Sequence, residues 1–207
     1  MKNRVLPGVQ VIYIKSIKFK TMKVSLKITI VLLLGLVGSL SVHAQKYMTK
    51  NGNIMFYSET PMETIKAVNE QVNAALDIQT GEIVFKVLIQ SFQFPKALMQ
   101  EHFNENYMES DKFPNTTFKG KITNISSIDF SKEGTYDAVI EGDMTIHGVT
   151  NHISEKGTII VETGDKIHAT SKFLVKVADY NIKIPGTVIN NIAESIEVTV
   201  NVDLAKM

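Results

Sequence analysis

The sequence predicts an all-β protein: a barrel of about eight antiparallel strands with a short helical insertion after the third strand. Apolar and polar residues alternate through nearly all of residues 45–207, as they do in strands with one buried face and one wet face. Short turn sequences containing glycine stand where many of these alternating runs end. Eight such strands can close into a barrel that is either filled by side chains or holds one elongated ligand.

The first three strands are alternating runs upstream of residue 90. Their inward rows are Ile54 and Phe56, then Val72, Ala74, Leu76 and Ile78, then Ile83, Phe85, Val87 and Ile89. The turn Gln79-Thr80-Gly81 separates the second row from the third and is short enough to join antiparallel neighbours.

One stretch, between Pro95 and Pro114, breaks the alternation. Its apolar positions at helical spacing are Leu98, His102 or Phe103, and Tyr107, and its wetter side carries Glu101, Glu105 and Glu109. A proline just before a helix is favourable, because its missing N–H has no partner to lose there. We therefore predict a helix that plugs or covers one end of the barrel.

Five further strands follow the predicted helix. Their inward rows are Phe118, Gly120 and Ile122; Tyr136, Ala138, Ile140, Gly142, Met144 and Ile146; Val149, Ile153, Ile159 and Val161; Ile167, Ala169, Phe173, Val175 and Val177; and Ile196, Val198, Val200, Val202 and Leu204. Turns are predicted at Glu133-Gly134, His147-Gly148 and Thr163-Gly164-Asp165. By parity with Asp143 and Thr145, His147 is expected to face outward, and a role in the turn is favoured over a catalytic one.

Residues 1–44 are predicted to be an N-terminal extension and a cleaved signal peptide. The apolar run of residues 28–40 follows Lys23 and Lys27 and precedes small residues that end at Ala44, as in a signal-peptidase site. The run is shorter than the roughly 20 residues of a membrane span. Translation is expected to start at Met22, and the domain of residues 45–207 is expected in the periplasm or outside the cell without a stable membrane anchor. An uncleaved anchor is the alternative.

Net charge and cysteine content limit the kinds of partner and the chemistry that this protein can have. Residues 1–44 carry seven of the 22 basic residues and none of the 21 acidic ones, so residues 45–207 keep 15 basic residues and a net charge of −6. This acidic balance argues against nucleic acid or an anionic membrane surface as the partner. The absence of cysteine excludes disulfides and thiol chemistry.

The residue types that could support catalysis do not form known patterns. The group of Glu101, His102, Glu105, Glu109 and Asp111 offers carboxylates and an imidazole, but its spacing fits neither H-x-x-x-H nor H-x-x-E-H, so an acidic solvated helix face is favoured. There is no G-x-S-x-G and no glycine-rich phosphate loop. We therefore predict no metal site, no cofactor and no enzymatic activity.

Three segments resemble the YceI-like family, whose members are known as lipid or polyisoprenoid binders. They are GNIMFYS (52–58), the block SFQFPKALMQEHFNENYMESDKFPNTTFKGKI (91–122) and MTIHGVT (144–150). The resemblance covers about residues 51–204. It implies an extended, lipocalin-like barrel with a helical insertion, a long apolar tunnel for an isoprenoid or acyl chain, frequent dimerisation and export. The family shares a type of pocket more than a fixed set of contact residues.

Small and aromatic residues on the inward rows are the candidates for such a tunnel. The small ones are Ala74, Gly120, Ala138, Gly142, Ala169 and Ser171, which either leave room for a chain or accommodate barrel taper and close strand crossings. The aromatic candidates for the lining are Phe56, Phe85, Phe92, Phe94, Phe103, Phe118, Phe173 and Tyr180, although each alone could be core. Four of them, Phe92, Phe94, Phe103 and Tyr180, lie near strand ends, where a mouth is expected.

Three functions are therefore compared. The favoured one is a non-catalytic carrier that holds a polyisoprenoid or other long-chain lipid in the barrel. A structural or interaction barrel with a filled core predicts no cavity larger than a water molecule. An enzyme acting on an apolar substrate needs convergent polar groups inside the barrel, and the inward rows above contain almost none.

Overall fold

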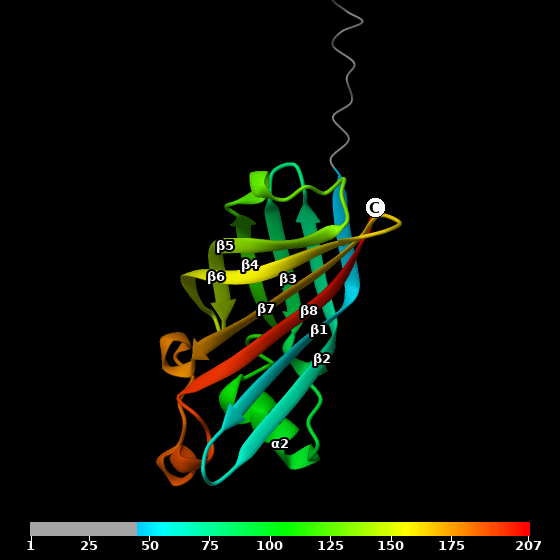
Figure 1. The fold of residues 1–207 in the computed structure, drawn as a ribbon. Helices are drawn as coiled ribbons and strands as arrows, with labels where there is room; N and C mark the ends of the chain where they lie inside the picture. Colours follow the sequence, from blue (N-terminus) through cyan, green and yellow to red (C-terminus); the bar gives the residue numbers. More distant parts are fainter. Residues whose placement is uncertain (1–44) are drawn as a thin grey trace, which may run out of the picture. The chain divides into compact units, whose positions relative to one another are not determined.

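Eight antiparallel strands pair in chain order and close into one barrel through contacts between the first strand and the last (Figure 1). The computed structural model describes residues 45–207, so the predicted extension and signal peptide lie outside the described residues. The strands are β1 (Lys46–Glu59), β2 (Thr64–Asp77), β3 (Glu82–Leu88), β4 (Asn115–Ile122), β5 (Gly134–Ile146), β6 (Val149–Glu162), β7 (Lys166–Lys176) and β8 (Ser195–Lys206). The predicted fold class and strand number are confirmed.

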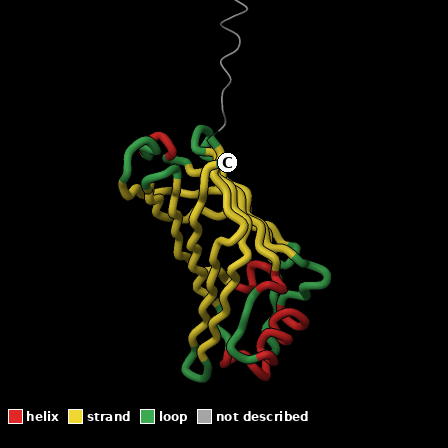
Figure 2. Tube along the Cα trace, turned by 90° about the vertical axis from the view of Figure 1, so that its right-hand side faces the viewer, coloured by secondary structure: helices red, strands yellow, loops and turns green. Residues whose placement is uncertain are grey.

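Short helical segments fill the connections, and most of them lie toward one end of the barrel (Figure 2). They are η1 (Ile89–Ser91), α2 (Ala97–His102), η2 (Phe103–Tyr107), η3 (Ile125–Ser127), η4 (Val177–Tyr180) and η5 (Gly186–Asn191). No helix within residues 45–207 combines the length and the apolar character needed to cross a membrane.

The helical insertion follows β3 as predicted, but it is not one regular helix. Its α-helical part has only six residues, and the five residues from Phe103 to Tyr107 form a π-type turn. The predicted apolar positions Leu98, Phe103 and Tyr107 nevertheless all line the cavity inside the barrel. Leu98 is also 60% exposed, whereas Phe103 packs against the apolar cluster beneath the insertion.

The interior has a filled end and a hollow part. Buried side chains at the end that holds the β2–β3 turn pack into one cluster, which includes Leu76, Ile122, Ile167 and Leu204, each at most 1% exposed. A second cluster lies beneath the helical insertion and contains Phe92 and Met108. The space between the two clusters is the candidate site.

Candidate ligand-binding cavity

An apolar cavity of about 510 Å³ lies inside the barrel. All eight strands contribute to its wall, together with α2, η2 and the chain around η5. Its size lies within the range of roughly 300–1,000 Å³ that is typical of small-molecule sites. A void of this volume contradicts the alternative of a barrel filled by its own side chains.

Strand alternation positions the wall as predicted. On β8, Ile196, Val198 and Val200 line the cavity, and the same inward row continues into the filled end with Val202 and Leu204. Successive side chains of a strand point to opposite faces, so one apolar row serves both regions. The wall is therefore mostly apolar and continues into the packed cluster at the filled end of the barrel.

The predicted lining residues are brought together with one exception. Those on the cavity wall are Phe56, Phe85, Phe92, Phe94, Phe103, Phe118 and Phe173. The exception is Tyr180, which lies on η4, is 3% exposed and packs against Met144 and Val175 outside this cavity. Burial raises the pKa of the Tyr180 phenol.

Four of the phenylalanines form a cluster at the end beneath the insertion. The ring of Phe56 is stacked on that of Phe103 with 5.3 Å between centroids, and it also contacts Phe92 at 5.4 Å and Phe94 at 5.6 Å. Aromatic pairs at such distances add to the stability that burial provides. The cluster therefore joins β1, the chain after β3 and the helical insertion into one rigid wall.

The small inward residues have two different roles. Ala138, Ala169 and Ser171 line the cavity, as a ligand tunnel requires. Gly120 and Gly142 instead face each other across the β4–β5 ladder, and the ring of Phe118 occupies the place of a Gly120 side chain. Some of the small residues therefore leave room in the cavity, whereas Gly120 and Gly142 accommodate a close approach of two strands.

One acidic side chain contacts two other segments at the helical end of the cavity. Glu63, beside the β1–β2 turn, accepts a hydrogen bond of 3.1 Å from the Asn191 amide and pairs with Lys96 at 3.9 Å. These contacts tie the turn to η5 and to the start of α2, and all three residues line the cavity. The sequence reasoning missed this group, because its members are far apart along the chain.

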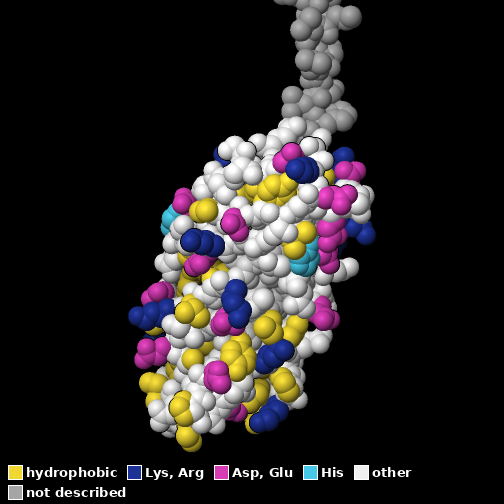
Figure 3. All heavy atoms as spheres, in the orientation of Figure 1, with side chains coloured by type: hydrophobic (Ala, Val, Ile, Leu, Met, Phe, Trp, Pro, Cys, Tyr) yellow, Lys and Arg dark blue, Asp and Glu magenta, His cyan; other side chains and the backbone are white. Residues whose placement is uncertain are grey.

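The same end carries exposed apolar side chains. Met62 is 71% exposed, Leu98 60% and Ile189 54%, and they stand on the β1–β2 turn, α2 and η5. Apolar side chains are frequent on this lower part of the face drawn in Figure 3. We call Met62, Leu98 and Ile189 the apolar rim.

One charged residue lies deeper in the wall and was also missed. Glu155 on β6 shares the inward row of Ile153 and Ile159, lines the cavity and is only partly exposed. Burial raises the pKa of its carboxyl. The sequence does indicate its position, because Glu155 lies an even number of positions from Ile153 and Ile159 and so on the same face of the strand.

The acidic group around His102 does not assemble into a site. Glu101, His102 and Glu105 are exposed, and of these His102 alone borders the cavity. Within residues 45–207, no group of three or more histidine, cysteine or acidic side chains is arranged to hold a metal ion.

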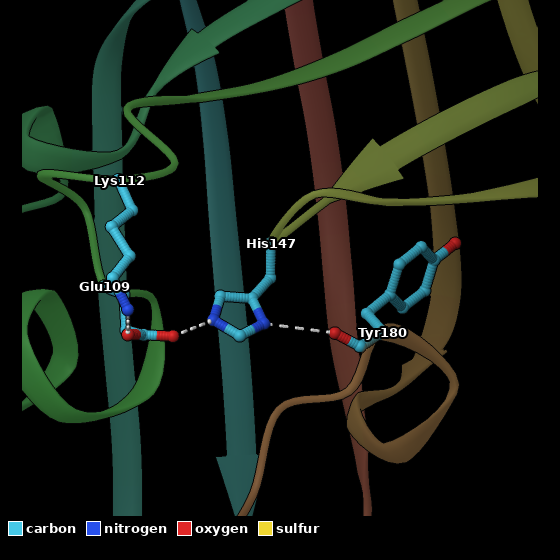
Figure 4. Close-up of polar contacts among 4 residues, drawn as sticks. All are labelled: Glu109, Lys112, His147 and Tyr180. Atoms are coloured by element: carbon cyan, nitrogen blue, oxygen red, sulfur yellow. Dashed lines mark hydrogen bonds and ion pairs between the residues drawn. The ribbon is translucent and has the colours of Figure 1, made fainter.

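His147 corrects one prediction, because its side chain is 11% exposed instead of facing outward. Its Nε2 lies 3.0 Å from Oε2 of Glu109 and its Nδ1 lies 3.2 Å from the carbonyl oxygen of Tyr180 (Figure 4). The parity rule failed because His147 has a positive φ of 50° in the turn, which ends the strand alternation one residue earlier.

The fold and the cavity define a class of protein: closed antiparallel barrels with an apolar cavity inside. The YceI-like domain family model matches residues 41–204, and the chain belongs to this family. Among curated protein sequences, none matches the chain.

Solved structures share the fold at low sequence identity. A polyisoprenoid-binding domain from Saccharophagus degradans has a TM-score of 0.70 at 11% identity, covering 79% of this chain and 99% of that one. BcnA of Burkholderia cenocepacia has a TM-score of 0.62 at 14% identity, covering 74% and 96%. The YceI protein of Campylobacter jejuni has a TM-score of 0.53 at 17% identity, covering 68% and 84%.

Proposed function

We propose that this protein is an exported, non-catalytic binding protein that holds a polyisoprenoid or another long-chain lipid inside its barrel. The observation that carries the proposal is the apolar cavity of about 510 Å³. A lipid chain in this cavity would exchange water for contacts with apolar side chains from every strand. Transport, storage or sequestration of the lipid would follow from such binding.

The energetics favour a long chain over a small ligand. Each methylene group removed from water contributes about 0.8 kcal/mol, before the cost of ordering a flexible chain. The membership in the YceI-like family and the description of the Saccharophagus degradans neighbour as polyisoprenoid-binding support an isoprenoid chain. An apolar wall discriminates poorly among chains, so the few polar groups must supply the selectivity.

The polar side chains on the cavity wall support ligand binding without catalysis. Within the described residues, the charged or imidazole side chains on the cavity wall are Glu63, Lys96, His102 and Glu155. None of these side chains hydrogen-bonds a serine, threonine or tyrosine of the wall that residues 45–207 form. Nucleophilic catalysis requires a nucleophile and a base within hydrogen-bonding distance.

Export is proposed from residues 28–44, whose composition is that of a signal peptide. A soluble barrel that shields an apolar chain would be useful where lipids must cross an aqueous compartment. Mass spectrometry of the secreted or periplasmic protein, expressed from Met22 in a bacterial host, tests this point. An N-terminus at Gln45 is expected, and retention of residues 28–44 would contradict cleavage.

Lipid binding is tested on protein purified without detergent. Organic extraction and mass spectrometry are expected to recover a long-chain lipid, and adding isoprenoids to the stripped protein should raise its melting temperature, since a ligand that binds only the folded state stabilises it. Absence of lipid in the extract and of any shift with isoprenoids and fatty acids would contradict the proposal.

A matched pair of variants locates the binding. Ala138 is 1% exposed and lines the cavity, whereas Ala75 lies on β2 outside its wall. Ala138→Leu is expected to weaken lipid binding at least tenfold by occupying the cavity, and Ala75→Leu is expected to leave it unchanged. Circular dichroism melting of both variants separates blocked binding from loss of the fold.

A further inference from the structure

The barrel wall is interrupted between β6 and β7. Their ladder runs from the Glu162–Lys166 pair to the Gly157–Ser171 pair and ends there. Beyond that point, within the described residues, β6 pairs only with β5 and β7 only with β8. We call the unpaired facing edges, residues 149–156 and 172–176, the seam.

Side-chain hydrogen bonds hold both ends of the seam. At one end the Ser171 hydroxyl donates to the Lys156 carbonyl oxygen at 2.7 Å. At the other end the Asn151 amide donates to the Asp179 carbonyl oxygen at 2.8 Å. β6 is therefore tethered to β7 on one side of the unpaired stretch and to η4 on the other.

A second, smaller pocket of about 320 Å³ lies along the seam. Five residues line both this pocket and the main cavity: Met144, Ile153, Glu155, Phe173 and Val175. The outer side of the pocket carries His152, Leu174 and Lys176, which are all exposed. The five shared side chains thus form the boundary between the apolar interior and the surface.

Glu155 is the one charged residue in this boundary, and no partner satisfies it. Among residues 45–207 it has neither an ion pair nor a side-chain hydrogen bond, and Lys176 on the same pocket does not pair with it. An ionised carboxylate accepts hydrogen bonds but donates none, and leaving it unpaired in an apolar setting is unfavourable.

We propose that Glu155 is a specificity-determining residue: it accepts a hydrogen bond from the hydroxyl group of a long-chain alcohol whose chain occupies the main cavity. The same carboxylate disfavours lipids that end in a carboxylate or a phosphate, because two like charges repel each other at close range. The polar end of the ligand then lies at the seam, with the smaller pocket connecting it to solvent. This inference rests on the proposed lipid-binding function.

The experiment compares three ligands of identical chain: geranylgeraniol, geranylgeranoic acid and geranylgeranyl monophosphate. Each displaces a fluorescent fatty alcohol from stripped protein at slightly alkaline pH. The proteins are the wild type, Glu155→Gln and the control Glu162→Gln, which removes an exposed carboxylate from the same strand. Circular dichroism melting verifies that each variant is folded.

The wild type and Glu162→Gln are expected to prefer the alcohol over both anions by about tenfold or more, the size of one hydrogen bond to a charged group. Glu155→Gln is expected to reduce this preference to about threefold or less, mainly through tighter binding of the acid, to which an amide can donate. Equal affinities in the wild type, or an unchanged preference in Glu155→Gln, would overturn the assignment while leaving lipid binding intact. Failure of all three ligands to bind any of the proteins would instead overturn the proposed function, and this inference with it.

Discussion

His147 and Glu109 meet across 38 residues of sequence, with 3.0 Å between Nε2 of the imidazole and Oε2 of the carboxylate (Figure 4). Both residues have positive φ, 50° for His147 and 42° for Glu109, so each belongs to a tight turn. The contact joins the β5–β6 turn to the end of the helical insertion, and the second ring nitrogen reaches the carbonyl of Tyr180 on η4. One side chain therefore connects three segments that border the cavity or the seam.

Replacing this side chain should loosen those segments. We expect His147→Asn to lower the melting temperature by about 2–5 °C, the size of one or two lost hydrogen bonds in a chain of this length. Asparagine tolerates the positive φ, so backbone strain is not added. His152→Asn is the control, because His152 is an exposed histidine whose side chain, among residues 45–207, bonds only Asp143 on the adjacent strand. Equal effects of the two substitutions would contradict a linking role for His147.

Glu109 should make the fold sensitive to acid. Hydrogen bonds from Lys112 and then from His147 lower the pKa of its carboxyl below the ordinary value of 4.5. A carboxyl whose pKa is lower in the folded chain stabilises the fold above the unfolded pKa, and this stability is lost as the pH falls through the folded pKa. Glu109→Gln is therefore expected to be less stable than the wild type at neutral pH, with a difference that shrinks below pH 4.5 in urea unfolding. A difference independent of pH would contradict this origin.

Glu155 should have the opposite effect. Burial raises the pKa of its carboxyl above 4.5, so its contribution to stability is present below the unfolded pKa and is lost as the pH rises through the folded pKa. Glu155→Gln is expected to melt higher than the wild type at neutral pH and equally at acid pH. The other ionisable groups on the seam pocket, His152, Lys176, Asp179 and Tyr180, are common to both proteins, so their titration cancels in the comparison.

Gly142 should be irreplaceable even by alanine. A Cβ at this position would collide with the backbone of Gly120 and with the carbonyl oxygen of Lys119 on the paired strand β4. Such overpacking against backbone costs about 3 kcal/mol. Gly186→Ala is the control, because nothing lies within 4 Å of a Cβ added there. Urea unfolding is expected to show a large loss for Gly142→Ala and almost none for Gly186→Ala.

The apolar rim should govern loading of the cavity from membranes. Exposed apolar side chains that surround the end of a ligand site can enter a lipid surface. Replacing Met62 and Ile189, which do not line the cavity, together by serine is expected to slow transfer of a fluorescent isoprenoid from vesicles at least fivefold, with little change in affinity for the dispersed lipid. Leu174→Ser, which changes an exposed side chain at the seam, serves as the comparison. If Leu174→Ser slowed transfer more than the rim substitutions do, the lipid would enter the cavity at the seam instead.

Much of the cavity wall was predictable because strand alternation is local. Side chains two residues apart lie on the same face, so the rows that contain Phe85, Phe118 and Val198 could be assigned without knowledge of their partners. The inward position of Glu155 follows from the same rule, because it lies two residues after Ile153 and four before Ile159 on β6. The π-type turn in the helical insertion was not predictable, because the apolar positions alone do not distinguish a regular helix from one that contains a wider turn.

By itself, the sequence determined the number of strands, the buried face of each, the site of the insertion and the aromatic character of the wall. All of these depend on spacing within a few residues. Only the tertiary structure decided that the β6–β7 ladder stops at Gly157, that Glu63 contacts Asn191 and that His147 turns inward to Glu109. Each of these depends on segments that are distant in sequence and meet only when the barrel closes, so no local pattern records them.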